Sequence, residues 1–500
     1  MIYWTRTVYL DHNATTPLAD EVCDAMVRAM EHTHGNASSL HTAGREARGL
    51  IDQARMSVAS AIGCDPGQIL FTSGGTEANN TVIQGVFAAA GKGHVITSRI
   101  EHESVLGACQ RVIALGGEVT FLDAGSDGRV RVEDVRAAIR PDTILISIMH
   151  ANNETGAIQP IEELASVAAQ AGIALHTDAV QSVGKIPVQV DALGCEFLTL
   201  TAHKIRGPKG VGAIYWRGKT PWIPLVHGGD QERGLRPGTE AAHQIVGLGA
   251  AIDLAMRRMD DDSARLRRLR GKLIEGIRSV WPESRIHEAP EGSQVPGTVN
   301  VAFCGKEGIR VLAGLDCHLV SVSIGSACTA DRIEPSHVLI GMGISTEEAL
   351  SSIRMSMGAT TSAKDVDYVL KVLREVLQND PEGFGYMDPQ HLTEERIRSE
   401  HSFLIDLRMP FERLVRPSLP GAKEWSYVGF ERRMPQVPRD KEAILICSTG
   451  ILSMAMGYRL ARSGHPKVRV IYGGYDAWHA QYPKLLAKLR QKRDAGEQGA

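Results

Sequence analysis

Residues 197–204 (FLTLTAHK) and the earlier run 173–178 (IALHTD) decide the fold class of this chain. Both are short runs of Leu, Ile, Phe and Thr with little polar alternation, a pattern typical of strands buried on both faces. Similar runs lie upstream at 68–73 (QILFTS), 94–98 (HVITS) and 143–149 (TILISIM), with helical patterns between them. The sequence therefore predicts an α/β protein with a mainly parallel sheet and crossover helices.

Polar residues gather at the carboxyl ends of these runs. Segment 73–76 (SGGT), Asn153, Asp178, and the pair His203 and Lys204 each follow a predicted strand. Ligands of open α/β sheets bind at this edge. We therefore expect a ligand site that is assembled from several strands.

The residue types at this edge indicate which ligand it is. A buried lysine such as Lys204 can form a Schiff base, and Gly75 with Thr76 at a helix start can cradle a phosphate. Asp178 can face a pyridinium nitrogen, and His102 can stack on an aromatic ring. Taken singly, these are more often a surface lysine, a helix start, a turn residue and a satisfied histidine. Together they describe a pyridoxal phosphate site, and no dinucleotide or P-loop motif competes with it.

Composition excludes several classes of protein. The chain has 500 residues, 43% hydrophobic and 23% charged, with a net charge of −3. This is typical of an ordinary globular protein and gives no broad basic field for nucleic acid or an anionic membrane. Without a signal-type segment or a long apolar run, we expect a cytoplasmic protein. The eight cysteines include no C-x-x-C pair, which argues against a disulfide scaffold.

A series of motifs then carries a family resemblance. Residues 8 to about 378 resemble the cysteine desulfurases, pyridoxal phosphate enzymes of fold-type I in the class V aminotransferase-like group. The motifs are YLDHNATTP, HGNASSLHTAGREA, FTSGGTEANN, EHESV, HANNETGAIQPI, HTDAVQSVGK, AHKIRGPKGVG, ERGLRPGTE, GSACTADRIEPSHVL and IRMSMG.

The resemblance implies roles around the cofactor ring. Lys204 would hold the cofactor and move the substrate Cα proton, while Asp178 pairs with the ring nitrogen. Gln181 would hydrogen-bond the phenolic oxygen, and His102 would stack on the ring and assist proton transfer. Asn153 would contact both cofactor and substrate.

It also implies roles at the two ends of the site. The expected phosphate ligands are Gly75, Thr76, Thr201 and His203. Thr239 would reach the phosphate from the second subunit of a homodimer. Arg354, with Asn153, would hold the substrate carboxylate, a task suited to a guanidinium. No metal site is expected.

Cys328 lies in SVSIGSACTADRIEPSHVL, a stretch of small residues that leaves a thiol accessible. The ordinary alternative is a buried structural cysteine. The resemblance makes Cys328 the nucleophile that takes sulfur from L-cysteine as a persulfide and releases L-alanine. The long spacing to Glu334 resembles the iron–sulfur and nitrogen-fixation desulfurases, not the short-loop group with the selenocysteine lyases.

The C-terminal part resembles a rhodanese domain, through FLIDLRMPFE, LPGA, AILICSTGILSMA and VIYGGYDAWHA. Cys447 ends a predicted strand, and backbone N–H groups of the following loop favour a thiolate or persulfide. A core cysteine is the ordinary alternative. Ser448 and Leu452 stand where rhodanese loops often carry arginine, so we expect poor use of thiosulfate and a donor in the Cys328 persulfide.

The sequence thus predicts a desulfurase that relays sulfur from Cys328 to Cys447 and on to an acceptor protein, in iron–sulfur assembly or in thiocofactor or tRNA thiolation. Two alternatives stay open: a rhodanese-like domain that only docks the acceptor, and another class V enzyme such as a selenocysteine lyase. The expected partners are L-cysteine, an acceptor protein and a second copy of the chain, with no direct nucleic acid or membrane.

The predicted domain organisation has three folded parts. The desulfurase spans 1–378, with a large cofactor-binding domain at about 15–255 and a small α/β domain from the N-terminal segment and about 256–378. The other divisions are a Pro/Gly-rich linker at 379–390, the rhodanese-like α/β domain at 391–490 and a flexible tail at 491–500.

Overall fold

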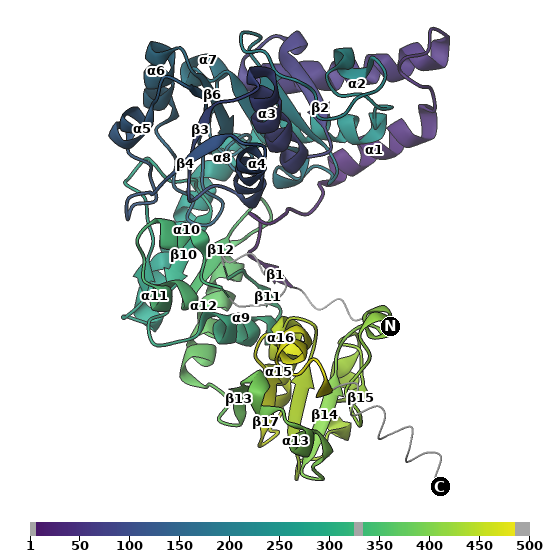
Figure 1. Cartoon of the computed structure of the whole chain (residues 1–500), viewed down its shortest axis with the longest axis vertical. Coiled ribbons are helices and arrows are strands. Elements are labelled where there is room, and N and C mark those ends of the chain that lie inside the picture. Colours follow the sequence, from purple (N-terminus) through teal and green to yellow (C-terminus); the bar gives the residue numbers. More distant parts are fainter. Residues whose placement is uncertain (1–6, 325–333, 486–500) are drawn as a thin grey trace.

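The computed structural model describes residues 7–324 and 334–485. Cys328 and the predicted tail at 491–500 lie outside the described residues. Figure 1 shows a large α/β layer at one end, a smaller domain in the middle, and a third sheet with its own helices at the other end. No helix within the described ranges is long and apolar enough to cross a membrane.

The large domain is built on a seven-stranded sheet in the order β2-β8-β7-β6-β5-β3-β4. Its strands are β2 (Ile69–Thr72), β3 (His94–Ser98), β4 (Glu118–Leu122), β5 (Thr143–Ser147), β6 (Ala174–Asp178), β7 (Phe197–Thr201) and β8 (Gly212–Trp216). β8 is antiparallel to both of its neighbours, and the other pairings are parallel. The predicted α/β fold is confirmed, and the sheet is mixed.

Both faces of this sheet are covered, which explains the unbroken apolar runs. Leu198 and Leu200 enter one hydrophobic cluster, while Phe197 enters the cluster on the other face. The surrounding helices are α1 (Asp20–His32), α2 (Thr42–Ile62), α3 (Gly75–Ala90), α4 (Glu103–Ala114), α5 (Val132–Ala138), α6 (Ile161–Ala171) and α7 (Val190–Leu193).

A long helix, α8 (Ala242–Val280), leads from the large domain into the small one. The small domain has an antiparallel sheet of β9 (Arg285–Ile286), β10 (Thr298–Ala302) and β12 (Ser352–Ser356). Its helices are α9 (Gly308–Cys317), α10 (His337–Gly341), α11 (Thr346–Leu350) and α12 (Ala363–Gln378). The N-terminal strand β1 (Val8–Tyr9) pairs with β11 (Val320–Ser321), so the chain start joins this domain.

The C-terminal domain has a parallel sheet in the order β13-β17-β16-β14-β15. Its strands are β13 (Phe384–Met387), β14 (Ser402–Asp406), β15 (Lys423–Glu424), β16 (Glu442–Ile446) and β17 (Val468–Ile471). Its helices are α13 (Glu394–Arg398), α14 (Pro410–Val415), α15 (Ile451–Arg462) and α16 (Gly474–Gln481).

The structure differs from the predicted linker at 379–390. β13 lies inside that segment and pairs with β17, so the third sheet begins before residue 391. The run FGYM is only four residues long and stands between Pro and Gly residues, so its strand character is hidden by turn signals.

The C-terminal domain packs directly on the small domain. Helix α15 lies against α9, as Figure 1 shows. Ile309 and Ala313 of α9 belong to the same hydrophobic cluster as Cys447. Arg459 bonds Asp316 at 2.7 Å across this contact. The two parts therefore share a hydrophobic cluster and a charged rim.

Candidate active site

A cavity of about 420 Å³ lies at the carboxyl edge of the large sheet, within the size range of small-molecule sites. All of the predicted cofactor and substrate residues except Thr239 line it. They are Gly75, Thr76, His102, Asn153, Asp178, Gln181, Thr201, His203, Lys204 and Arg354. Residues that lie far apart in the sequence therefore meet in one cavity, as the strand-end pattern predicts.

One end of the cavity is suited to a phosphate. Helix α3 begins at Gly75 and has no side chain capping its N-terminus, and Gly75 and Thr76 both line the cavity. A Cβ atom at Gly75 would lie 3.0 Å from a methyl of Val180. Backbone N–H groups at a helix start attract an anion. Thr201 and His203 border the same cavity.

Asp178 is held in place by neutral donors. Asn79 Nδ2 donates to one carboxylate oxygen at 2.7 Å, and the backbone N–H of Val180 donates to the other at 2.9 Å. Thr199 Oγ1 donates to Asn79 Oδ1 at 2.6 Å and so fixes which end of the amide faces Asp178. Within residues 7–324 and 334–485, the hydrogen-bond donors to this carboxylate are neutral, which suits a partner for a cationic ring nitrogen.

His102 stands at the start of α4 and faces the cavity. Its Nδ1 accepts a hydrogen bond from the backbone N–H of Ser104 at 3.1 Å, so this histidine caps the helix. Loss of solvation lowers the pKa of His102, while the nearby Asp178 opposes this shift. This bond orients the imidazole ring, so His102 can cap the helix and also stack on a cofactor ring.

Lys204 follows β7 in a short 3₁₀ turn. Its Nζ donates to the backbone oxygens of Asn13 at 2.5 Å and Ala14 at 2.8 Å. Burial, reinforced by the positive charge of Arg354, lowers the pKa of Lys204 to about 8. A lysine with a lowered pKa offers a neutral, nucleophilic amine near neutral pH.

Arg354 and Asn153, the predicted substrate residues, each carry a buried polar atom in this cavity. Arg354 Nη2 bonds Asp11 Oδ1 at 2.7 Å, and Nη1 donates to the backbone oxygen of Asn153 at 3.3 Å. Arg354 Nε and Asn153 Oδ1 are buried without a hydrogen-bond partner among the described residues. Such atoms suit contacts to a polar ligand, because an unpaired buried polar group is costly.

Thr239 is exposed and lies outside the residues that line this cavity. A role toward the cofactor of its own chain is therefore not supported by this arrangement. The predicted role in the second subunit of a dimer remains a prediction.

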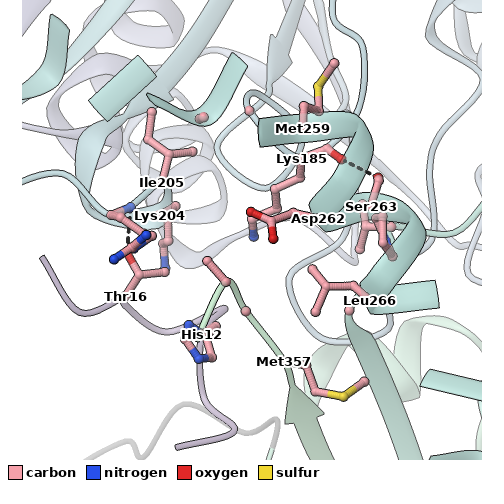
Figure 2. A pocket seen from close by; sticks show the side chains of 18 of the residues that line it. His12, Thr16, Lys185, Lys204, Ile205, Met259, Asp262, Ser263, Leu266 and Met357 are labelled. Carbon is pink, nitrogen blue, oxygen red and sulfur yellow. Dashed lines mark hydrogen bonds between the residues drawn. The ribbon is translucent and has the colours of Figure 1, made fainter. Parts of the chain in front are cut away.

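A second, smaller cavity of about 90 Å³ lies behind Lys204, between α8 and the segment that carries His12. Figure 2 shows Lys185 extending from its backbone into this cavity. Both ring nitrogens of His12 are buried and have no hydrogen-bond partner in the part of the chain that the structure describes, and burial lowers the pKa of His12 to about 4. Asn13 and Lys204 line both cavities.

Cys447 follows the last residue of β16, and its side chain is 2% exposed. Its Sγ accepts hydrogen bonds from the backbone N–H groups of Gly450 at 3.2 Å and Ser453 at 3.3 Å. Gly450 has a φ of +90°, which favours glycine and lets the loop turn around the sulfur. The loop can thus stabilise negative charge on this sulfur.

Several functional contacts were missed by sequence reasoning. Asn79 orients Asp178, Asp11 pairs with Arg354, and the Asn13 backbone oxygen accepts from Lys204. Asn79 lies in the quoted motif FTSGGTEANN, and Asp11 and Asn13 lie in YLDHNATTP. The presence of these residues in the motifs could have marked them as functional, but a motif does not show which residues are in contact.

These features fit pyridoxal phosphate, the cofactor that the resemblance implies. The uncapped start of α3 matches its phosphate, and Asp178 matches its ring nitrogen. Lys204 supplies the amine for a Schiff base, and the unpaired Asn153 and Arg354 atoms lie where substrate is expected. The donor set therefore agrees with this cofactor.

Comparison with known proteins gives the same result. The family model "Aminotransferase class-V" matches residues 8–369, and the model "Rhodanese-like domain" matches residues 389–481. The cysteine desulfurase IscS of Dictyoglomus turgidum is 47% identical over 379 residues, which cover 75% of this chain and 95% of that protein.

Solved structures agree as well. A NifS-like protein shares 35% identity at a TM-score of 0.70, over 74% of this chain and 99% of that one. SspA in complex with cysteine shares 37% identity at a TM-score of 0.63, over 71% of this chain and all of that one (100%). The chain therefore belongs to the class V aminotransferase family as a cysteine desulfurase, and it carries a C-terminal rhodanese-like domain.

Proposed function

We propose that this enzyme uses pyridoxal phosphate to convert L-cysteine into L-alanine and passes the sulfur from Cys328 to Cys447. Enzymes of the class V family depend on this cofactor. The main support from the structure is that the predicted cofactor and substrate residues line one cavity. SspA, a similar protein, has been solved in complex with cysteine, which supports the substrate.

Pyridoxal phosphate, when bound, supplies an electron sink for the substrate Cα. The residues of this chain bind the cofactor and orient it. The N-terminus of α3 holds the phosphate, Asp178 keeps the ring nitrogen protonated, and His102 covers the ring. Lys204 Nζ accepts and returns the Cα proton, because its lowered pKa allows both protonation states.

Arg354 and Asn153 bind the substrate carboxylate. Arg354 is pre-oriented by Asp11, so its guanidinium is fixed before substrate arrives. Its unpaired Nε then gains an acceptor from the substrate. A fixed guanidinium that is hydrogen-bonded on one side binds a carboxylate with little loss of conformational freedom.

Cys328 takes the sulfur. Its thiolate attacks the substrate sulfur, so an S–S bond forms while the C–S bond of the substrate breaks. The electron pair of the broken C–S bond stays with the substrate Cβ, which takes up one proton and becomes the methyl group of alanine. For the relay, the Cys447 thiolate attacks the outer sulfur of the Cys328 persulfide and releases the Cys328 thiolate, with no net oxidation.

The packing between domains supports transfer within one chain. Ile324, four residues before Cys328, packs against the hydrophobic cluster that contains Cys447. The loop around Cys447 supplies N–H donors for the transferred sulfur. The final acceptor would be a protein of iron–sulfur assembly or of thiocofactor or tRNA thiolation.

One observation favours a different role for the rhodanese-like domain. Cys447 is only 2% exposed, which suits a cysteine that never meets a donor. In that second reading the domain docks the acceptor protein and carries no sulfur. A homodimer, with Thr239 reaching the partner's phosphate, belongs to both readings.

Persulfide mapping separates these readings. The holoenzyme is incubated with L-cysteine, persulfides are trapped by alkylation, and peptides are identified by mass spectrometry. We expect persulfide on Cys328 and Cys447, and loss of both in Cys328→Ala. Persulfide on Cys328 alone would leave the docking role. No persulfide and no alanine would refute the proposed reaction, and a parallel assay with L-selenocysteine tests the lyase alternative.

A further inference from the structure

Lys185 is a half-buried titratable group that the roles above leave unused. It lies four residues after Gln181, in the turn that follows β6 (Ala174–Asp178). Its Nζ donates to Gln181 Oε1 at 2.6 Å and to Asn13 Oδ1 at 3.3 Å. It lines the small cavity behind Lys204, not the cofactor cavity (Figure 2).

The side-chain amide of Gln181 must adopt one of two possible orientations to contact the cofactor. Its role in the proposed site is to donate a hydrogen bond to the phenolic oxygen of the cofactor. A glutamine amide has a donor end and an acceptor end of nearly equal size. If the amide turned by 180°, its oxygen would face the phenolic oxygen and the contact would become repulsive.

Two neighbours of Gln181 each permit only one orientation. An ammonium group has no acceptor, so Lys185 must be met by the amide oxygen. The Asn13 backbone oxygen has no donor, so it must be met by the amide nitrogen, which donates to it at 2.9 Å. This leaves the second Nε2 hydrogen of Gln181 for the cofactor.

We propose that Lys185 is a positioning residue for the cofactor: its ammonium group fixes the Gln181 amide with the nitrogen toward the phenolic oxygen. The inference rests on the proposed placement of pyridoxal phosphate. Lys185 touches neither cofactor nor substrate in this arrangement and acts through Gln181.

The same contacts tie this orientation to the catalytic lysine. The Asn13 backbone oxygen also accepts from Lys204 Nζ at 2.5 Å. Asn13 Nδ2 donates to Thr298 Oγ1 at 2.9 Å, which anchors the segment to the small domain. Asn13 therefore connects Lys185, Gln181 and Lys204, and a loose Asn13 would loosen all three.

The charges around Lys185 matter for the choice of assay. Burial lowers the pKa of Lys185 to about 7, and the positive charges of Lys204 and Arg354 add to this effect. The other titratable side chains that line its cavity are His12, Lys204, Arg206, Arg258 and Asp262. Cofactor affinity is therefore measured at pH 6, where the ammonium form of Lys185 predominates.

The test is a double-mutant cycle on Lys185→Met and Gln181→Leu. The readouts are the dissociation constant of pyridoxal phosphate from the apoprotein and the pH midpoint of the cofactor's absorbance change. Gln181→Leu should weaken binding about tenfold and raise the midpoint by roughly one pH unit, because the phenolic oxygen loses its donor. Lys185→Met should shift both readouts in the same direction but by less, because the Asn13 backbone oxygen still holds the amide nitrogen. The double variant should show no change beyond that of Gln181→Leu.

A pure charge effect of Lys185 would give a different result. It would also raise the midpoint, but it would persist in the Gln181→Leu background, and additive shifts would overturn the inference. Lys185→Arg, which keeps a donor-only cation, should stay close to wild type. Lys272→Met is the matched control, because Lys272 of α8 pairs with the exposed Asp367 of α12, away from the cavity.

A negative result of the double-mutant cycle shows which of the two assumptions is wrong. If Gln181→Leu itself changes neither readout, the proposed placement of Gln181 is wrong and the inference falls with it. If Gln181→Leu changes both but Lys185→Met changes neither, only the role of Lys185 is wrong. Should Lys185→Met fail to fold, Lys185→Gln replaces it, and it should give an intermediate shift because its amide allows either orientation.

Discussion

The cofactor cavity and the Cys447 loop are built in opposite ways. The cavity collects side chains from strand ends and helix starts between Asn13 and Arg354 in the chain. The sulfur site uses one short loop, in which Gly450 and Ser453 donate to Cys447. Among the described residues, two buried polar atoms of the cavity have no hydrogen-bond partner, whereas the sulfur already has its donors and Cys447 is 2% exposed.

This contrast indicates what each site needs from outside. The cavity leaves polar atoms available for a ligand, because Asn153 Oδ1 and Arg354 Nε have no hydrogen-bond partner among the described residues. The loop is complete and is suited to negative charge on its own sulfur. Single substitutions in the cavity should therefore abolish alanine formation. Substitutions in the Cys447 loop should change sulfur transfer and leave alanine formation intact.

The largest effect is expected for Lys204→Ala. Without its amine the Cα proton has no acceptor at that position, so alanine formation from L-cysteine should fall on the order of 1,000-fold or more. Cys447→Ser is the matched substitution in the other site and should leave alanine formation within about twofold of wild type. A strong loss of alanine formation in Cys447→Ser would show that the two sites are not separable.

Ala313→Arg tests whether the packing of α15 on α9 connects the two sites. Ala313 is 1% exposed in the cluster shared with the C-terminal domain. A buried arginine there should separate the domains and lower persulfide formation on Cys447 by about tenfold, with alanine formation retained. Trapping and peptide mass spectrometry provide the measurement.

The control is Ala88→Arg, the same substitution at an exposed position of α3. It should leave both readouts unchanged. If Ala313→Arg also leaves the Cys447 persulfide unchanged, sulfur reaches Cys447 by a route that does not need this interface, such as transfer between subunits.

The sequence predicted the strands that are buried. The runs at 94–98 and 143–149 became β3 and β5, because apolar side chains are needed on both faces. β4 was missed because its residues are exposed or half-buried, whereas β2, at the other edge of the sheet, is buried throughout and was predicted. β8 was missed because it follows a Gly/Pro-rich turn that hides its start.

The candidate site was predictable as residue types but not as contacts. Lys204 and Asp178 could be placed at strand ends from their own sequence. The contact between Asn79 and Asp178 joins residues 99 positions apart, and that between Asn13 and Lys204 joins residues 191 positions apart. Such contacts depend on the packing of distant elements, which a pattern within one element does not encode.

The pH dependence of cofactor incorporation tests whether the cavity lowers the pKa of Lys204. Schiff-base formation needs the neutral amine, and the pKa of Lys204 is lowered from 10.5 to about 8. The lower pKa makes the neutral form available at lower pH. The rate of pyridoxal phosphate incorporation should therefore rise with pH up to about pH 8 and then level off.

Arg354→Met tests the cause of this shift. Burial is the main cause and the charge of Arg354 the second, so removing that charge should move the midpoint of incorporation upward by about half a pH unit to one unit. The rate is followed by absorbance in both proteins with the same cofactor solution, so ionisations of the cofactor itself cancel. An unchanged midpoint would assign the shift to burial alone.

The smallest effect is expected at the sulfur loop. Leu452 is 40% exposed in the first turn of α15, and the loop around Cys447 offers neutral donors in place of a cation. The wild-type protein should use thiosulfate poorly as a donor to cyanide, and Leu452→Arg should raise that turnover by about tenfold, since a nearby cation attracts the anionic donor. The matched control is Leu115→Arg, an exposed leucine of the large domain. A rise in Leu452→Arg alone would show that the loop is catalytically competent and lacks only the charge, whereas no rise would favour the docking role of the domain.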